Sequence, residues 1–255
     1  TLVDLSLKSG GAGRILVSGR DFYSNPRISP DGTQLAWIQW DHPQMPWDGT
    51  ELWTGEMRDD GSITEKQQLA GGLTESIFHP EWSPDGILYF VSDRTGWWNL
   101  YRWTNEQVES VCEMQAEFGL PQWQLSSTTY GFASEDRIVC SYIDRGISHV
   151  ANIFPKSGKF DPIPTRYTDV GSIRVSSEAV IFEAGSPSEP SAIVRHDFST
   201  GALEPLRSSS DVLIEDRYLS QPQSIEYKTE NGLSAHAFFY PPKNQDYIVS
   251  AGEKP

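Results

Sequence analysis

The sequence predicts an all-β protein, a partial β-propeller of about four four-stranded blades plus a half blade that ends in a β-hairpin. The segment Ser-Pro-Asp-Gly occurs twice, at Ser29–Gly32 and Ser83–Gly86, and an apolar run follows each copy. Repeats of about 40 to 50 residues that contain several short strands are typical of propeller blades. The composition agrees, because 12% of the 255 residues are aromatic and the chain contains 21 Gly and 17 Pro. No apolar run approaches the roughly 20 residues of a membrane helix.

The Ser-Pro-Asp-Gly segments are predicted to be turns rather than metal sites. Proline has the φ that the second position of a turn requires, Asp accepts local amide hydrogen bonds, and Gly follows at the fourth position. Each turn should join the first strand of a blade to the second. The second strands, Leu35–Trp40, Ile87–Ser92 and Ala179–Phe182, are apolar almost without alternation. A continuous apolar run indicates burial on both faces of the sheet.

Weaker copies of the repeat start at Pro121–Trp123 and near Ser172. In the copy at Pro121, either Tyr130–Ala133 or Arg137–Tyr142 is the second strand, and the sequence leaves both possibilities open. The repeats divide the chain into an outer half blade, four blades and a terminal segment. In order, these are residues 1–18, 19–72, 73–120, 121–170, 171–220 and 221–255.

Charge and cysteine content limit the possible partners. The formal net charge is −15, so neither nucleic acid nor an anionic membrane is an expected partner. Cys112 and Cys140 lack metal-ligand spacing and are expected to be buried free thiols, which suits a reducing compartment such as the cytoplasm. We expect no cofactor and no metal, because the sequence contains no His-Glu-x-x-His motif, phosphate-binding glycine loop or EF-hand loop.

Three segments carry a resemblance to a known family. Trp40–Trp53, Ser92–Tyr101 and Thr229–His236 resemble the prolyl oligopeptidase family of serine peptidases, and within it the bacterial enzymes called dipeptidyl aminopeptidase or acylaminoacyl-peptidase. The resemblance covers essentially the whole chain. It implies a propeller of seven or eight blades that caps an α/β-hydrolase domain, and this domain carries the catalytic Ser, Asp and His. The hairpin Ile225–Tyr240 resembles the opening strands of that domain.

The catalytic machinery that the resemblance implies is not in this sequence. No Gly-x-Ser-x-Gly nucleophile elbow occurs, so we expect no catalytic residue here. A longer parent protein would be a serine-type peptidase. Its propeller would gate access and help anchor short peptides for the hydrolase domain. Blade topology places the loops after the second and fourth strands on one face, and we expect that face to meet the hydrolase domain.

One loop on this face, Gln39–Glu51, is longer than its counterpart in the next blade. As candidate substrate-facing residues, Met45 and Trp47 offer apolar contact, and Asp41 and Asp48 could meet the ammonium group of a peptide. Two alternatives stay open. The loop could pack its own side chains against the rim of the blade, or Asp41, His42 and Asp48 could hold a metal ion.

Arg94, Trp97 and Trp98, together with His42 of the long loop, complete the candidate substrate-facing set. Arg94 could bind a carboxylate of the substrate or of the hydrolase domain, and the competing interpretation is an ion pair with an Asp across the blade. Of the two tryptophans, one should be buried and the other exposed, because adjacent strand residues point in opposite directions.

Two other classes of function stay open. A standalone propeller that binds protein partners, as in the Tol system, would have no need of the terminal hairpin. A propeller enzyme of the glycosidase type needs two carboxylates that flank a cleft, and the sequence singles out no such pair. Four and a half blades do not close a ring of seven or eight, so we also expect self-association through the open flanks of the end blades.

Overall fold

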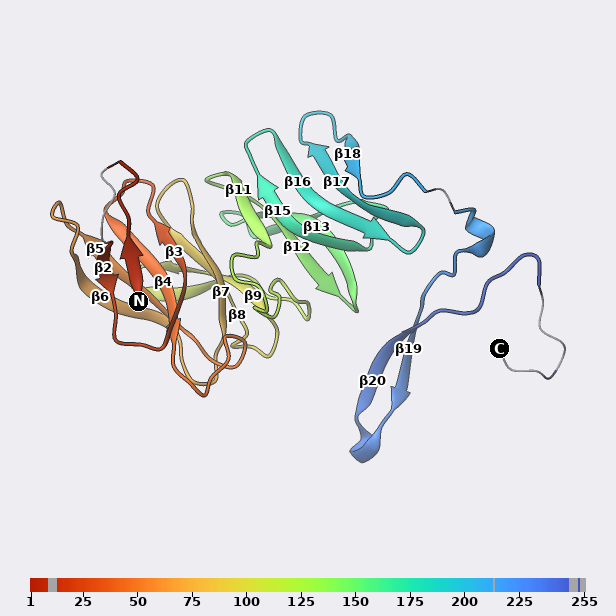
Figure 1. Ribbon diagram of the computed structural model, residues 1–255, viewed down its shortest axis with the longest axis horizontal. Helices are drawn as coiled ribbons and strands as arrows, with labels where there is room; N and C mark the ends of the chain where they lie inside the picture. Colours follow the sequence, from red (N-terminus) through yellow and green to blue (C-terminus); the bar gives the residue numbers. More distant parts are fainter. Residues whose placement is uncertain (9–12, 213, 248–251, 253–255) are drawn as a thin grey trace.

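The strands of the computed structural model form four four-stranded antiparallel sheets, with a two-stranded pair before them and another after them (Figure 1). The structure describes residues 1–8, 13–212, 214–247 and 252. The predicted all-β, partial-propeller fold is confirmed. The end of the predicted terminal segment, residues 248–251 and 253–255, lies outside the described residues. No helix in the described part of the chain is long and apolar enough to cross a membrane.

Within each sheet the strands follow one another in chain order, and every neighbouring pair is antiparallel. The first pair is β1 (Leu2–Asp4) and β2 (Arg14–Val17). The first sheet is β3 (Phe22–Ile28), β4 (Gln34–Trp40), β5 (Glu51–Met57) and β6 (Ile63–Gly71). The second sheet is β7 (Ile77–Trp82), β8 (Leu88–Ser92), β9 (Asn99–Thr104) and β10 (Gln107–Cys112).

The third sheet is β11 (Tyr130–Ser134), β12 (Arg137–Asp144), β13 (Ile147–Phe154) and β14 (Lys159–Ile163). The fourth sheet is β15 (Asp169–Val175), β16 (Ala179–Ser186), β17 (Glu189–Asp197) and β18 (Leu203–Ser208). The terminal hairpin is β19 (Gln223–Lys228) and β20 (Ser234–Phe239). Asn231 and Gly232 at its tip both have positive φ, as the Asn-Gly pair of a tight hairpin turn requires.

The Ser-Pro-Asp-Gly segments are turns between the first and second strands of their sheets. The Gly32 amide donates to the Ser29 carbonyl at 2.9 Å, and the Thr33 amide donates to the Asp31 carboxylate at 3.0 Å. In the second copy, the Ser83 hydroxyl donates to the Asp85 carboxylate at 2.6 Å. The aspartates therefore close their own turns, as the sequence predicts.

Each sheet buries its apolar residues against the next sheet. Ile38 of the first sheet and Phe90 of the second share one core cluster, and Val91 of the second and Ile138 of the third share another. The second strand β8 is therefore buried on both faces along its whole length, and the second strand β4 is buried on both faces from Leu35 onwards. The same prediction for Ala179–Phe182 is wrong at Ile181, which is 38% exposed. Within the described residues the fourth sheet has a packed sheet on one face only, so Ile181 on its other face stays open to solvent.

The third repeat begins later than the sequence predicts. Pro121–Trp123 is not part of a first strand but lies in a connection, residues 113–129, that joins β10 to β11. β11 is the first strand of this sheet and β12 the second, which settles the choice that the sequence left open. The connection is much longer than its counterparts between the other sheets, residues 72–76 and 164–168.

Both cysteines are free thiols in the core between the second and third sheets. Cys140 is buried and Cys112 is half-buried. Burial, together with the nearby Glu113 carboxylate, raises the pKa of the Cys112 thiol to about 11, and burial raises the pKa of Cys140 further. Both groups are therefore protonated and unreactive at neutral pH.

Candidate functional site

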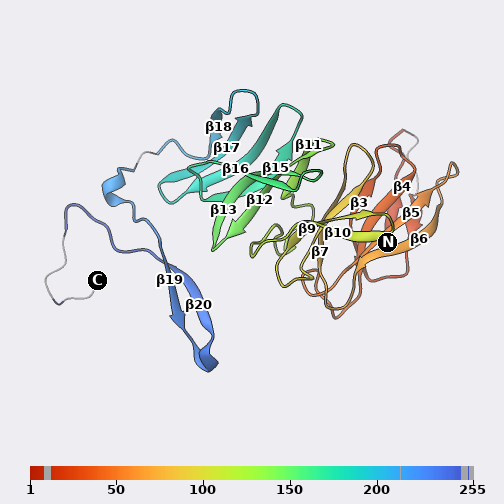
Figure 2. The same ribbon diagram turned by 180° about the vertical axis from the view of Figure 1, so that it is seen from behind.

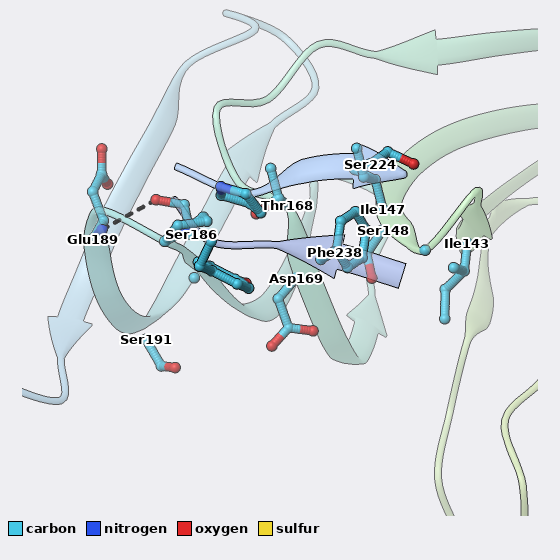
Figure 3. Close-up of a pocket in the computed structure, with 15 residues that line it drawn as sticks. Ile143, Ile147, Ser148, Thr168, Asp169, Ser186, Glu189, Ser191, Ser224 and Phe238 are labelled. Atoms are coloured by element: carbon cyan, nitrogen blue, oxygen red, sulfur yellow. Dashed lines mark hydrogen bonds between the residues drawn. The ribbon is translucent and has the colours of Figure 1, made fainter. Parts of the chain in front are cut away.

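The terminal hairpin projects from the end of the molecule that carries the third and fourth sheets (Figure 1 and Figure 2), and it shares a cavity with the loops after the second and fourth strands of these sheets. A Cβ atom on Gly146, between β12 and β13, would lie 2.8 Å from the Phe238 ring of β20. A cavity of about 490 Å³ separates the hairpin from these sheets. Figure 3 shows Phe238 and Ser224 of the hairpin around this cavity, together with Ile147 of β13 and Thr168 of the connection between β14 and β15.

Two further cavities continue along the same face. The first, of about 500 Å³, is lined by residues that include Trp97, Gln115, Glu117, Ile143, Asp144, His236 and Phe238. The second, of about 370 Å³, is lined by Trp47, Trp98, Glu117, Gly119, Leu120, Pro121, Trp123 and Ile143. Glu117 and Ile143 line both cavities, so the two adjoin. We call the first the hairpin cavity and the second the tryptophan pocket.

The long loop between β4 and β5 forms one wall of the tryptophan pocket because hydrogen bonds tie it to other sheets. The Pro46 carbonyl accepts from the Ser76 hydroxyl at 2.7 Å and from the Gln122 side-chain amide at 3.2 Å. The same amide donates to the Ile77 carbonyl at 3.0 Å. These bonds bring the Trp47 ring to 4.3 Å from the Trp123 ring, between centroids.

The opposite wall is Trp98, which lies on the backbone of the connection between β10 and β11. The Trp98 amide donates to the Glu117 carboxylate at 2.9 Å, and the Phe118 amide donates to the Trp98 carbonyl at 2.7 Å. A Cβ atom on Gly119 would overlap the Trp98 ring. The indole therefore reaches this position only because residue 119 has no side chain.

The two adjacent tryptophans differ in exposure, but the prediction that one of them is buried is wrong. Trp97 is 38% exposed and lines the hairpin cavity. Trp98 is half-buried and packs against the core between the second and third sheets. Both tryptophans precede β9 (Asn99–Thr104), so strand alternation does not account for the difference, and each side chain lines a different cavity.

The aspartates of the long loop, Asp41 and Asp48, form hydrogen bonds and an ion pair within their own blade. The Asp41 carboxylate accepts from the Asp21 amide at 2.9 Å and from the Arg20 guanidinium at 2.6 Å. The amide hydrogen bond and the guanidinium together lower the pKa of Asp41. Asp48 accepts from the Met45 amide at 3.1 Å, so it closes a turn of the loop.

His42 and Met45 are both exposed on this loop, and neither lines the tryptophan pocket. The described part of the chain holds no group of three His, Cys, Asp or Glu side chains that could bind a metal ion. The alternative of a metal site at Asp41, His42 and Asp48 therefore has no support from the geometry.

Arg94 forms an ion pair, but its partner is not the Asp that the sequence suggests. Its guanidinium lies 2.7 Å from the Glu75 carboxylate and 5.0 Å from the centroid of the Tyr101 ring. Glu75 comes from the connection between the first and second sheets, a region that the sequence pattern does not align with Arg94. The pair joins two loops of the same face.

Glu117, Gln122 and Trp123 are site residues that sequence reasoning missed. All three lie in the long connection between β10 and β11, which the repeat pattern placed partly inside a blade. The signal that could have found them is the excess length of this connection, because long loops in compact domains often carry function.

Comparison with known proteins gives matches among solved structures. No protein-family model and no curated protein matches the sequence. The crystal structure of a puromycin hydrolase matches with a TM-score of 0.88 at 32% identity, over 96% of this chain and 37% of that chain. A puromycin-hydrolysing peptidase of Mycobacterium tuberculosis matches with a TM-score of 0.91 at 33% identity, over 97% of this chain and 39% of that chain. The chain thus spans less than two fifths of the length of these relatives.

More distant structures share the fold. Prolyl oligopeptidase B from Galerina marginata matches with a TM-score of 0.64 at 14% identity, over 85% of this chain and 30% of that chain. TolB from Acinetobacter baumannii matches with a TM-score of 0.57 at 13% identity, over 91% of this chain and 55% of that chain. At these identities the likeness shows the fold alone.

Proposed function

We propose that this chain, the β-propeller portion of a prolyl oligopeptidase-family protein, gates and helps anchor short peptides for a serine-peptidase domain that lies outside it. The observation that carries the proposal is the single face on which the terminal hairpin and three adjoining cavities come together. The relatives that match at 32% and 33% identity are named for puromycin hydrolysis, which supports a hydrolytic parent.

The residues of this face have different parts in the proposal. Trp47, Trp97 and Trp98 line cavities and would contact the substrate. Asp41 and Arg94, which are engaged in ion pairs, would hold the surrounding loops in place. Aromatic walls exclude water and restrict the motion of a bound peptide, and both effects favour reaction at a neighbouring catalytic group.

The hairpin offers a surface for the peptidase domain. Tyr227, Phe239 and Tyr240 are 52%, 47% and 55% exposed, and exposed apolar side chains on one hairpin are typical of a surface that another domain covers. The Ser, His and Asp of the reaction would come from that domain. A dipeptidyl aminopeptidase or acylaminoacyl-peptidase activity, a cytoplasmic location and association through the open end sheets stay predictions.

The test is an assay of the full-length protein that contains this chain. We expect it to release nitroaniline from aminoacyl- or acylaminoacyl-nitroanilides, and a serine-reactive inhibitor should abolish the release. If the propeller gates access, a short peptide should be cleaved faster than a much longer peptide that contains the same cleaved bond. No hydrolysis, or hydrolysis that the inhibitor leaves unchanged, would contradict the proposal and favour a protein-binding propeller.

A further inference from the structure

We propose that Arg27 and Arg174 bind a small oxyanion, a carboxylate or a phosphate, in a cavity at the opposite end of the sheets. The cavity has a volume of about 490 Å³ and is lined by residues of β3, β7, β11 and β15, the first strands of all four sheets. We call it the channel cavity, because first strands line the central channel of a propeller. The inference goes beyond the proposed function and does not depend on it.

The channel cavity lies away from the face that carries the hairpin cavity and the tryptophan pocket. Its lining includes Trp82 and Val175, the last residues of β7 and β15, and Pro84 of a Ser-Pro-Asp-Gly turn. These positions are at the ends of the first strands, whereas the other face carries the loops after the second and fourth strands. A ligand in the channel cavity therefore does not occupy the place proposed for the peptide.

The charged groups of the channel cavity are two guanidiniums and one carboxylate. Arg27 forms an ion pair with Glu81, with an N–O distance of 2.9 Å. Arg174 donates to the Ile173 carbonyl at 2.8 Å and to the Thr128 hydroxyl. Among the described residues, no carboxylate forms an ion pair with Arg174. The cavity therefore has an excess of positive charge, although the formal net charge of the chain is −15.

A buried histidine of the same cavity is affected by both guanidiniums. His79 lines the channel cavity and is 1% exposed. Burial, and then the nearby Arg27 and Arg174, lower the pKa of His79 to about 3, so the imidazole adds no charge at neutral pH. Because both guanidiniums act on one imidazole, an anion in this region of the cavity is attracted by both.

The available donors suit an oxyanion. Guanidinium groups bind carboxylates and phosphates through charge-assisted and often bidentate hydrogen bonds. Arg174 is exposed and its two acceptors are neutral, so an oxyanion reaches it without displacing a charged partner. The Ser126 hydroxyl also lines the cavity and can donate a further hydrogen bond. A cation would find only the Glu81 carboxylate, which Arg27 already engages.

The test is calorimetry on the full-length protein that contains this chain. Sodium phosphate and sodium acetate are titrated separately at neutral pH and constant low ionic strength, with sodium chloride as the reference salt. We expect saturable binding of at least one oxyanion, and the tighter of the two identifies its source. Arg174→Gln removes the unpaired positive charge and should weaken this binding by about tenfold. Arg174→Lys keeps the charge and should restore part of the affinity.

Two more variants serve as a second test and a matched control. Glu81→Gln keeps an oxygen for the Arg27 guanidinium but removes the one carboxylate of the described lining, so it should tighten oxyanion binding several-fold. Arg58→Gln changes the net charge of the protein as Arg174→Gln does. Arg58 pairs with Glu56 and does not line the channel cavity, so this variant should bind as the wild type does.

The competing interpretation is that Arg174 only fastens the connection between β10 and β11 to β15 through Thr128. In that case Arg174→Gln lowers the melting temperature but leaves oxyanion affinity unchanged, and the inference is overturned. Binding no stronger than that of chloride, or equal losses in Arg174→Gln and Arg58→Gln, would overturn it as well. Since binding is measured without hydrolysis, the result does not depend on the peptidase proposal.

Discussion

The middle sheets and the terminal strand pairs contain similar kinds of side chains in different surroundings. Phe90 in the second sheet and Val139 in the third are fully buried, because another sheet packs on each face of these two sheets. Ile15 in the first pair is 64% exposed, and Phe239 in the hairpin is 47% exposed. An apolar strand residue therefore contributes to stability according to whether another sheet covers the face to which it points, and the local sequence does not reveal this.

The sharpest test of this contrast is a pair of Phe→Ala substitutions. Phe90→Ala removes a ring from a closed core and should lower the free energy of unfolding by about 3–5 kcal/mol. Phe239→Ala removes a half-exposed ring and should cost about 1 kcal/mol or less. Urea denaturation of the chain measures both. Equal costs would show that the hairpin is as tightly packed as the middle sheets.

A smaller effect is expected at Gln122, which links two loops on the face that carries the hairpin cavity and the tryptophan pocket. Gln122 is 4% exposed, and its side-chain amide donates to the carbonyls of Pro46 and Ile77. Gln122→Ala leaves two buried carbonyls without this donor and should cost about 1–3 kcal/mol. Gln124→Ala, at an exposed position of the same connection, should change stability by about 0.5 kcal/mol or less. A neutral Gln122→Ala would mean that water replaces the donor.

The smallest expected effect is a pH dependence of stability, and it distinguishes a histidine of the second sheet from a histidine of the terminal hairpin. His79 in β7 is 1% exposed, whereas His236 in β20 is exposed. Burial, and then the nearby Arg27 and Arg174, lower the pKa of His79 from 6.5 to about 3. Between these pH values the unfolded chain binds the proton and the folded chain does not. Stability is therefore lost as the pH falls below 6.5, by about 1.4 kcal/mol at pH 5.5.

The variant His79→Asn separates this titration from other acid effects. His79 has φ 47°, and Asn25 occupies the corresponding first strand of the previous sheet with φ 49°. Asn tolerates this left-handed backbone, so the substitution removes the titrating group without adding strain. Urea unfolding at pH 7 and pH 5.5 should show a smaller difference for this variant than for the wild type. An unchanged difference would place the acid sensitivity elsewhere.

Much of the fold could be predicted because its signals are local. Pro30, Asp31 and Gly32 favour a turn whatever surrounds them, and the run Leu88–Ser92 is apolar enough to require two buried faces. The start of the third sheet was misplaced because Pro121–Trp123 imitates the first strand of a repeat. The segment Pro121–Trp123 instead links loops of different sheets, because the Gln122 side chain donates to the carbonyls of Pro46 and Ile77. These partners are distant in the sequence, so the pattern does not reveal the link.

The candidate site was only half predictable for the same reason. The excess length of the loop that carries Trp47 is visible in the sequence, and so is the pair Trp97 and Trp98. Neither the contact between Trp47 and Trp123 nor the position of Glu117 can be read from spacing, since they join separate sheets.

The sequence by itself determined the repeated sheets, their turns and the family resemblance, because turn chemistry and apolar runs act over a few neighbouring residues. Only the tertiary structure decided which carboxylate faces an aromatic pocket without a partner. Asp41 and Glu117 are both carboxylates in loops, but Arg20 reaches the first and no described cation pairs with the second. Charge pairing depends on distances across the fold, and these are set by the packing of one sheet on the next.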